Sequence, residues 1–140
     1  MSIYLDVNVL VALFVVDPLN ARADKAMRGL HDDLIVSNLS IAEFSAVIAR
    51  RVRTRDLSGS EARTAFTQFD AWCADYTRAM EMDGSDVATA IVWMRRLDLP
   101  LRTPDAQHIA IAQRTGCKLL TFDRTMAKVV RMLGVAIAKG

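Results

Sequence analysis

Short apolar runs alternate along the chain with longer segments in which apolar residues recur at helical spacing. The short runs are rich in β-branched and aromatic residues and predict strands; they cover residues 2–5, 34–37, 76–82, 118–121 and 135–138. The longer segments predict helices; they cover residues 7–16, 20–30, 40–53, 58–73 and 104–114. A further helix follows the break at Gly84-Ser85 and ends at Leu97, and another starts at Asp123. This alternation of strands and helices is typical of α/β proteins.

Residues with strong preferences at helix ends support several of these boundaries. Ser58 and Glu61 have the spacing of a capping box, in which each side chain binds a backbone N–H of the other residue. Thr103 is expected to cap the helix that has Pro104 at its first position, where proline fits best. Gly116 is expected to end that helix.

The order of elements predicts how the strands pair. Strands joined by helices imply a parallel sheet with helices on both faces, because each crossover is right-handed and must bury the sheet. We therefore expect residues 1–140 to form a single α/β domain, a three-layer α/β/α sandwich around a central parallel sheet of about five strands. Ligands of such sheets bind beyond the C-terminal ends of the strands, and candidate site residues belong there.

Composition excludes several other classes of protein. A chain of 140 residues that is 52% hydrophobic and 24% charged can bury its own core and is not disordered. Its two cysteines, Cys73 and Cys117, have no metal-ligand spacing and are expected to be reduced core thiols of a cytoplasmic protein. The apolar run at residues 9–16 is too short to span a bilayer and lacks the basic flank of a signal peptide.

The positive charge is carried mainly by arginine. Net charge is only +2, but 14 of the 18 basic residues are arginine. An arginine fork suits phosphate groups, although a GC-rich genome explains the same excess. Candidate contacts to the phosphates of a nucleic acid are Arg50, Arg51 and Arg53 at the end of one helix and Arg102 before another, and a solvated helix end is the alternative for the first three.

Four acidic residues are predicted at the same edge of the sheet. Asp6 and Asp123 directly follow strands, and Glu43 and Asp105 lie in the first turns of helices that begin at that edge. Each has an ordinary structural explanation when it is taken alone: Asp6 and Asp123 suit helix N-caps, Glu43 is spaced from Ser40 as a capping box, and Asp105 favours the helix dipole.

Together, the four acids predict a metal site. Two carboxylates about 5 Å apart repel by roughly 3 kcal/mol at an effective dielectric constant near 20, so a cluster of them usually holds a cation or shares protons. Oxygen ligands without histidine or cysteine suit Mg²⁺ or Mn²⁺. Such ions promote phosphodiester cleavage because they activate water and offset charge on the phosphate.

The chain resembles PIN-domain ribonucleases, and in particular the VapC-type toxins of type II toxin–antitoxin systems. The resemblance covers almost the whole chain and rests on four segments that occur in the family's order and spacing, namely Leu5-Asp6-Val7-Asn8-Val9-Leu10, Ser40-Ile41-Ala42-Glu43, Thr103-Pro104-Asp105-Ala106 and Thr121-Phe122-Asp123. It implies a Mg²⁺- or Mn²⁺-dependent endoribonuclease, a cognate antitoxin as partner, and self-association as a homodimer.

The resemblance also implies a role for each residue. Asp6, Glu43, Asp105 and Asp123 take the acidic positions, with Asp6 and Asp105 as direct metal ligands. The side chains of Asn8 and Thr121 are expected to hold Asp6 or a metal-bound water. Many members have threonine or serine where Val7 stands, so one supporting hydroxyl is absent here.

Two functions are alternatives to an endoribonuclease. A non-catalytic PIN-like module that binds RNA or protein remains open, although a scaffold has no reason to keep four repelling acids. A phosphotransferase of the haloacid-dehalogenase type needs a second aspartate two residues after the first, and Asn8 occupies that position. His108 has no serine, cysteine or histidine partner in sequence and is interpreted as a hydrogen-bonded helical histidine, and Trp72 and Trp93 as packing residues.

Overall fold

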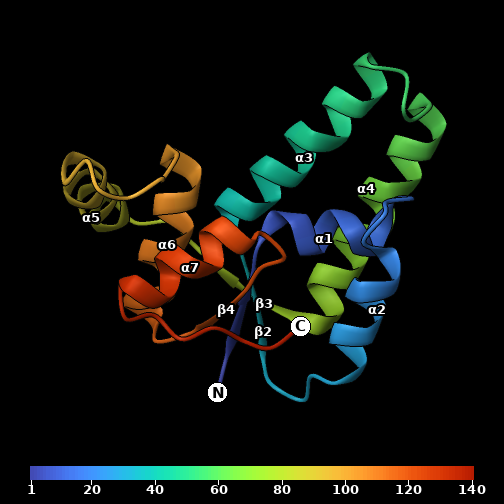
Figure 1. The fold of residues 1–140 in the computed structure, drawn as a ribbon. Helices are drawn as coiled ribbons and strands as arrows, with labels where there is room; N and C mark the ends of the chain where they lie inside the picture. The colour runs from blue at the N-terminus through green and yellow to red at the C-terminus, as the bar shows by residue number, and fades with distance from the viewer.

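The strands form one parallel sheet at the centre of the molecule. In the computed structural model, which describes all residues 1–140, the strands are β1 (Ile3–Leu5), β2 (Leu34–Ser37), β3 (Thr77–Met80) and β4 (Lys118–Leu120), in the order β3-β2-β1-β4. Tyr4 of the central strand β1 lies opposite Ile35 of β2 and Leu119 of β4. Because all pairs are parallel, the C-terminal ends of the strands share one edge of the sheet (Figure 1).

The predicted fifth strand is reduced to a single bridge. Residues 135–138 pair with β4 only where Ile137 lies opposite Leu119. Leu119 donates its N–H to Ala136 and accepts from the N–H of Ala138, both at 2.9 Å, and no further ladder forms. Four strands and this bridge agree with the prediction of about five parallel strands.

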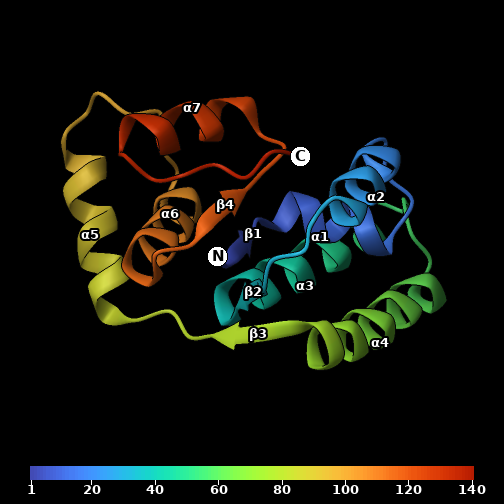
Figure 2. The same ribbon diagram turned by 90° about the horizontal axis from the view of Figure 1, so that it is seen from below.

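Seven helices surround the sheet. They are α1 (Val7–Phe14), α2 (Asn20–Arg28), α3 (Asn38–Arg53), α4 (Gly59–Tyr76), α5 (Gly84–Arg95), α6 (Thr103–Thr115) and α7 (Arg124–Met132). Figure 2 shows α1–α4 on one side of the strands and α5–α7 on the other. None of the helices is both long enough and apolar enough to cross a membrane.

Alternate residues of each strand supply the two faces of the sheet. Ile3 and Leu5 pack with α1, α3 and α4 in one core of 19 buried residues, whereas Tyr4 between them packs with α5–α7 in a second core of 14. This alternation follows from the two-residue period of a strand. The predicted three-layer α/β/α sandwich is therefore confirmed.

The tryptophans and cysteines have structural positions. Trp93 is buried in the second core, and Trp72 contacts Phe14 with ring centroids 5.4 Å apart, as expected of packing residues. Cys73 and Cys117 are unpaired, and Cys117 is buried. Burial also raises the pKa of the Cys73 thiol to about 11.

Two helix starts differ from prediction, and two helix ends agree with it. α3 begins at Asn38, and Ser37 caps it by accepting the N–H of Ser40, so the predicted Ser40–Glu43 capping box is wrong. Thr103 lies inside α6 and does not cap it; Arg102 occupies the cap position without a side-chain hydrogen bond. The capping box of Ser58 and Glu61 and the left-handed Gly116 (φ 69°) are both as predicted.

Candidate active site

Asp6 is the buried centre of the candidate site. It directly follows β1 and is only 4% exposed. Its Oδ1 accepts the N–H of Val7 at 2.7 Å, which caps α1, and its Oδ2 accepts the hydroxyl of Thr121 at 2.7 Å. The helix-cap interpretation of Asp6 is therefore correct, and the same carboxylate also joins the ends of two neighbouring strands.

Thr121 connects three of the predicted site residues. Its hydroxyl donates to Asp6 and accepts from the backbone N–H of Asp123 at 3.1 Å and from the amide of Asn8 at 3.3 Å. The carbonyl oxygen of the Asn8 side chain accepts the N–H of Phe122 at 3.3 Å. The turns after β1 and β4 are thus held together by side chains, and Asp6 has few ways to rotate.

Burial disfavours the charged form of Asp6. Loss of solvent raises the pKa of its carboxyl above the ordinary value, and the negative charge of Asp105 raises it further. A charge interaction with His108 and the hydrogen bonds from Thr121 and Val7 act in the opposite direction but do not cancel the effect of burial. A cation beside Asp6 would favour the ionised carboxylate.

Glu43 is held next to a buried histidine. Its Oε2 lies 3.2 Å from Nε2 of His108, which is fully buried on α6. The two groups are close enough for an ion pair if the ring is protonated, but they are not aligned as a hydrogen bond. Both Nε2 of His108 and the other oxygen of Glu43, Oε1, are buried without a hydrogen-bond partner.

A polar network in the core holds the other side of that histidine. The Tyr4 hydroxyl lies 2.5 Å from Nδ1 of His108, 2.6 Å from the Ser37 hydroxyl and 3.2 Å from the Ser40 hydroxyl. Burial raises the pKa of Tyr4 well above its ordinary value, so its hydroxyl keeps the proton. These four side chains connect the sheet to Glu43.

The contact between His108 and Glu43 was not predicted from the sequence. The interpretation of His108 as a hydrogen-bonded helical histidine is confirmed, but its neighbour is a predicted site residue. One signal was present in the sequence, because His108 lies three residues after Asp105 and thus on the same helix face. Another was Tyr4, whose hydroxyl needs a partner within an apolar strand.

Asp105 is paired with an arginine at the surface. Arg102 donates its Nε–H to Oδ2 of Asp105 at 3.2 Å, and the two side chains are 81% and 19% exposed. This hydrogen bond raises the pKa of Arg102, and the charges of Asp105, Asp123 and Glu43 add to the effect. The predicted RNA contact Arg102 therefore lies in the field of three of the four acids.

Asp123 caps α7. Its Oδ1 accepts the N–H of Met126 at 3.0 Å, and its own N–H is bound by Thr121. The structural interpretation of this residue is correct, and one of its carboxylate oxygens remains without a protein donor.

The four acids share one edge of the sheet but are not gathered as ligands. No group of three or more histidine, cysteine, aspartate or glutamate side chains is close enough to hold a metal ion. The chemistry of the groups nevertheless suits a hard divalent cation: the donors are carboxylates, Asp6 is buried with a raised pKa, and Glu43 has a buried oxygen with no partner. Asp6, Glu43 and Asp105 are the residues whose chemistry suits Mg²⁺ or Mn²⁺ at this edge.

The arginines of α3 lie away from these acids. The helix runs outward from the sheet (Figure 1), and Arg50 is seven residues beyond Glu43, or about 10 Å along the axis. Arg51 is paired with Asp17 at 2.7 Å, and Arg50 and Arg53 are exposed. Phosphate binding by these three residues stays a prediction.

Known proteins share both the sequence pattern and the fold. The sequence model of the PIN domain family matches residues 3–132. Ribonuclease VapC46 of Mycobacterium tuberculosis is 29% identical over 139 residues, which cover 97% of this chain and 95% of that protein.

Solved structures of low sequence identity have the same fold. The structure of M. tuberculosis VapC20, a sarcin–ricin loop cleaving toxin, has a TM-score of 0.78 at 18% identity and covers 99% of each chain. A toxin–antitoxin complex from Klebsiella pneumoniae has a TM-score of 0.59 at 17% identity, with 86% of this chain and 85% of that chain covered. With residues 3–132 matched and the parallel sheet and its acidic edge in place, this chain belongs to the PIN domain family.

Proposed function

We propose that this protein is a Mg²⁺- or Mn²⁺-dependent endoribonuclease and the VapC-type toxin of a toxin–antitoxin pair. The observation that carries the proposal is the buried Asp6 at the C-terminal end of the central strand, in the electrostatic field of a second acid, Asp105. A buried carboxylate with a raised pKa is costly for a purely structural residue and is typical of functional sites. The similarity to Ribonuclease VapC46 supports RNA as the substrate.

Each residue has a role that its contacts allow. Asp6 and Asp105 would hold the cation, and a bound divalent cation would lower the pKa of an attacking water and offset charge on the phosphate. Glu43, held by His108, would complete the ligand set or orient that water. Asp123 lies at the same edge, and Asn8 and Thr121 keep Asp6 in place.

The test compares two aspartates that are both paired with an arginine. Asp105→Asn should abolish Mg²⁺-dependent cleavage of a labelled RNA, because it removes a charged ligand. Asp98→Asn is the matched control, since Asp98 also accepts hydrogen bonds from a neighbouring arginine, Arg96, but lies outside the site. Wild-type cleavage by Asp105→Asn, or undiminished cleavage by the native chain in excess EDTA, would overturn the proposal.

The partners follow from the same proposal. A cognate antitoxin and a homodimer are expected, and the toxin–antitoxin complex from Klebsiella pneumoniae with this fold supports the first. Co-expression with the product of an adjacent small reading frame should give a complex that elutes as one species and suppresses cleavage. Light scattering of the chain alone should give twice the 15.5 kDa of one copy.

One observation favours a second candidate function. Because no three ligands are gathered, a non-catalytic PIN-like module that binds RNA or protein is the alternative. The cleavage test separates the two functions, since such a module would leave RNA intact with either metal.

A further inference from the structure

A cavity lies beside the candidate site, on the side of Thr121 that faces the end of the chain. It has a volume of about 560 Å³ and is lined by residues of α2, the turn after β4, α7 and residues 137–140. Thr121 and Asp123 belong to its wall, and the Thr121 hydroxyl is also the donor to Asp6. The cavity therefore adjoins the end of β4, next to the edge of the sheet that carries the acids.

The cavity is strongly basic. Its wall includes four exposed cationic side chains, Arg22, Arg124, Arg131 and Lys139, and a single acidic side chain, Asp123. None of the four cations forms an ion pair or a side-chain hydrogen bond.

Some arginines elsewhere in the molecule form ion pairs. Arg51, Arg96 and Arg114 each bind a carboxylate at 2.7–2.8 Å. Other exposed arginines, such as Arg28 and Arg63, are also unpaired, so what distinguishes the cavity is that four cations without ion pairs line one space.

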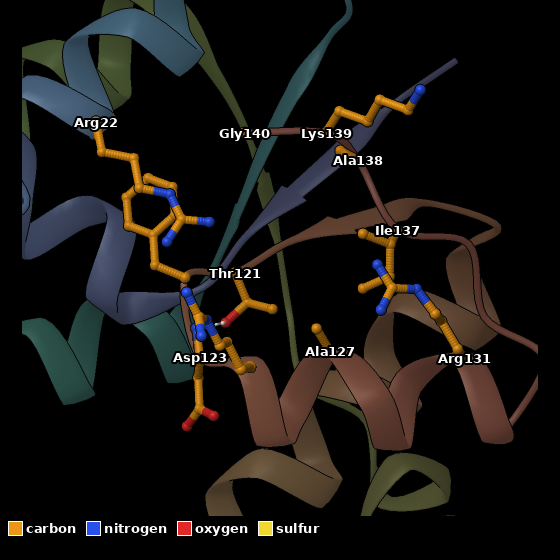
Figure 3. Close-up of a pocket in the computed structure, with 11 residues that line it drawn as sticks. Arg22, Thr121, Asp123, Ala127, Arg131, Ile137, Ala138, Lys139 and Gly140 are labelled. Carbon is orange, nitrogen blue, oxygen red and sulfur yellow. Dashed lines mark hydrogen bonds between the residues drawn. The ribbon is translucent and has the colours of Figure 1, made fainter.

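Two of the arginines approach the cavity from opposite sides. Figure 3 shows Arg22 above the turn after β4 and Arg131 on the α7 side beside Ile137, while the carboxylate of Asp123 points away from the space between them. The guanidinium of Arg22 stacks on the Phe122 ring, 4.4 Å from its centroid. Stacking orients this planar group and leaves its edge N–H donors free for an anion.

We propose that this cavity binds backbone phosphates of the RNA strand next to the phosphate that is cleaved. The inference rests on the proposed function and adds a substrate subsite to it. The acids at the sheet edge repel a polyanion, so binding of RNA there requires nearby positive charge. Arginine forks suit phosphate oxygens, and the shared wall residue Thr121 places such phosphates beside Asp6.

The test measures RNA binding without cleavage. A fluorescent oligouridine of twelve nucleotides is titrated with the protein in EDTA at several salt concentrations. For single strands the slope of log K against log salt is about −0.7 per phosphate contact. Arg22→Gln/Arg131→Gln should make the slope shallower by about 1.4 and weaken binding most at low salt.

Matched variants keep the test specific. Arg28→Gln/Arg63→Gln removes the same charge from exposed arginines that do not line the cavity, and it should leave the slope at the wild-type value. Arg124→Gln/Arg131→Gln leaves the stacking of Arg22 on Phe122 intact and should again make the slope shallower by about 1.4.

Two outcomes would overturn the subsite. One is a wild-type slope for both cavity variants. The other is unchanged RNA binding combined with loss of binding to a polyglutamate probe, which would assign the cavity to an acidic protein segment. Binding is measured without metal, so the subsite and the nuclease are tested separately. If the cavity variants have shallower slopes than wild type but the native chain does not cleave RNA, the subsite is supported and only the nuclease proposal is refuted.

Discussion

Asp6 combines three roles in one buried carboxylate. It caps α1, joins the turn after β1 to Thr121, and lies in the charge field of Asp105. Each of the first two roles needs one acceptor oxygen and no charge, and an asparagine would supply one of the two oxygens. The negative charge is needed for neither, so its cost is explained by the cation that we propose.

The pH dependence of stability tests this explanation. The pKa of Asp6 is higher in the folded protein than in the unfolded chain, where it is about 3.9. The ionised carboxylate therefore lowers stability progressively as the pH rises from the pKa of the unfolded chain through that of the folded protein. Asp6→Asn removes that cost. In EDTA the variant should resist urea as well as or better than wild type at pH 7, and the difference should shrink as the pH falls toward 4. The expectation is contradicted if the stability of Asp6→Asn relative to wild type is lower at pH 7 than at pH 4.

His108 is the second residue whose burial has a testable consequence. His108→Ala removes a partner of the Tyr4 hydroxyl and opens space beside Glu43, so it should lower the free energy of unfolding by about 2 kcal/mol and reduce cleavage. His31→Ala, at the exposed second histidine, should change stability by less than about 0.5 kcal/mol. Urea unfolding of both variants measures the difference, and equal effects would refute the role of His108.

At the scale of elements, the site depends on the contact between the ends of β1 and β4. Thr121→Val removes the donor to Asp6 and the acceptor for Asp123 and Asn8, so cleavage should fall by about tenfold or more with a stability loss of about 1–3 kcal/mol. Thr121→Ser keeps the hydroxyl, so its cleavage activity and its stability should both stay near the wild-type values. RNA cleavage and urea unfolding test the pair; equal activity of the two variants would show that the hydroxyl is not needed.

Some elements could be predicted from sequence and others could not. The bounds of β2 are those expected, because turn residues precede an apolar run of four. The start of α3 was missed because Ser37 both ends β2 and caps α3, leaving no loop to mark the boundary. The predicted strand at residues 135–138 is only a bridge to β4. An apolar run in the sequence does not show how many of its residues pair with the neighbouring strand.

At the scale of the whole molecule, the order of the strands could not be predicted from the sequence, but the edge of the sheet that carries the acids could. Parallel strands place their C-terminal ends together whatever their order, so the positions of Asp6 and Asp123 followed from the pattern alone. The cavity beside them could not be predicted, since α2, α7 and residues 137–140 meet only in the folded chain.

Metal binding should stabilise the whole domain. A ligand that binds only the folded state at 100 times its Kd adds about 2.7 kcal/mol, so Mn²⁺ should raise the Tm of the native chain by several degrees. Ca²⁺, a hard ion that also accepts oxygen ligands, should act in the same direction. Asp6→Asn and Asp105→Asn should lose most of the shift in a thermal unfolding scan, and a full shift in either variant would place the ion elsewhere.

The strand order also determines when the candidate site becomes complete during synthesis of the chain. The central strand β1 is synthesised first, but its neighbour β4 begins only at Lys118. Until then β1 has one open edge and Asp6 lacks Thr121, so a growing or truncated chain has no complete site. Pairings so distant in sequence also form slowly. If the chain is the toxin proposed above, this delay leaves time for an antitoxin to bind before RNA can be cleaved.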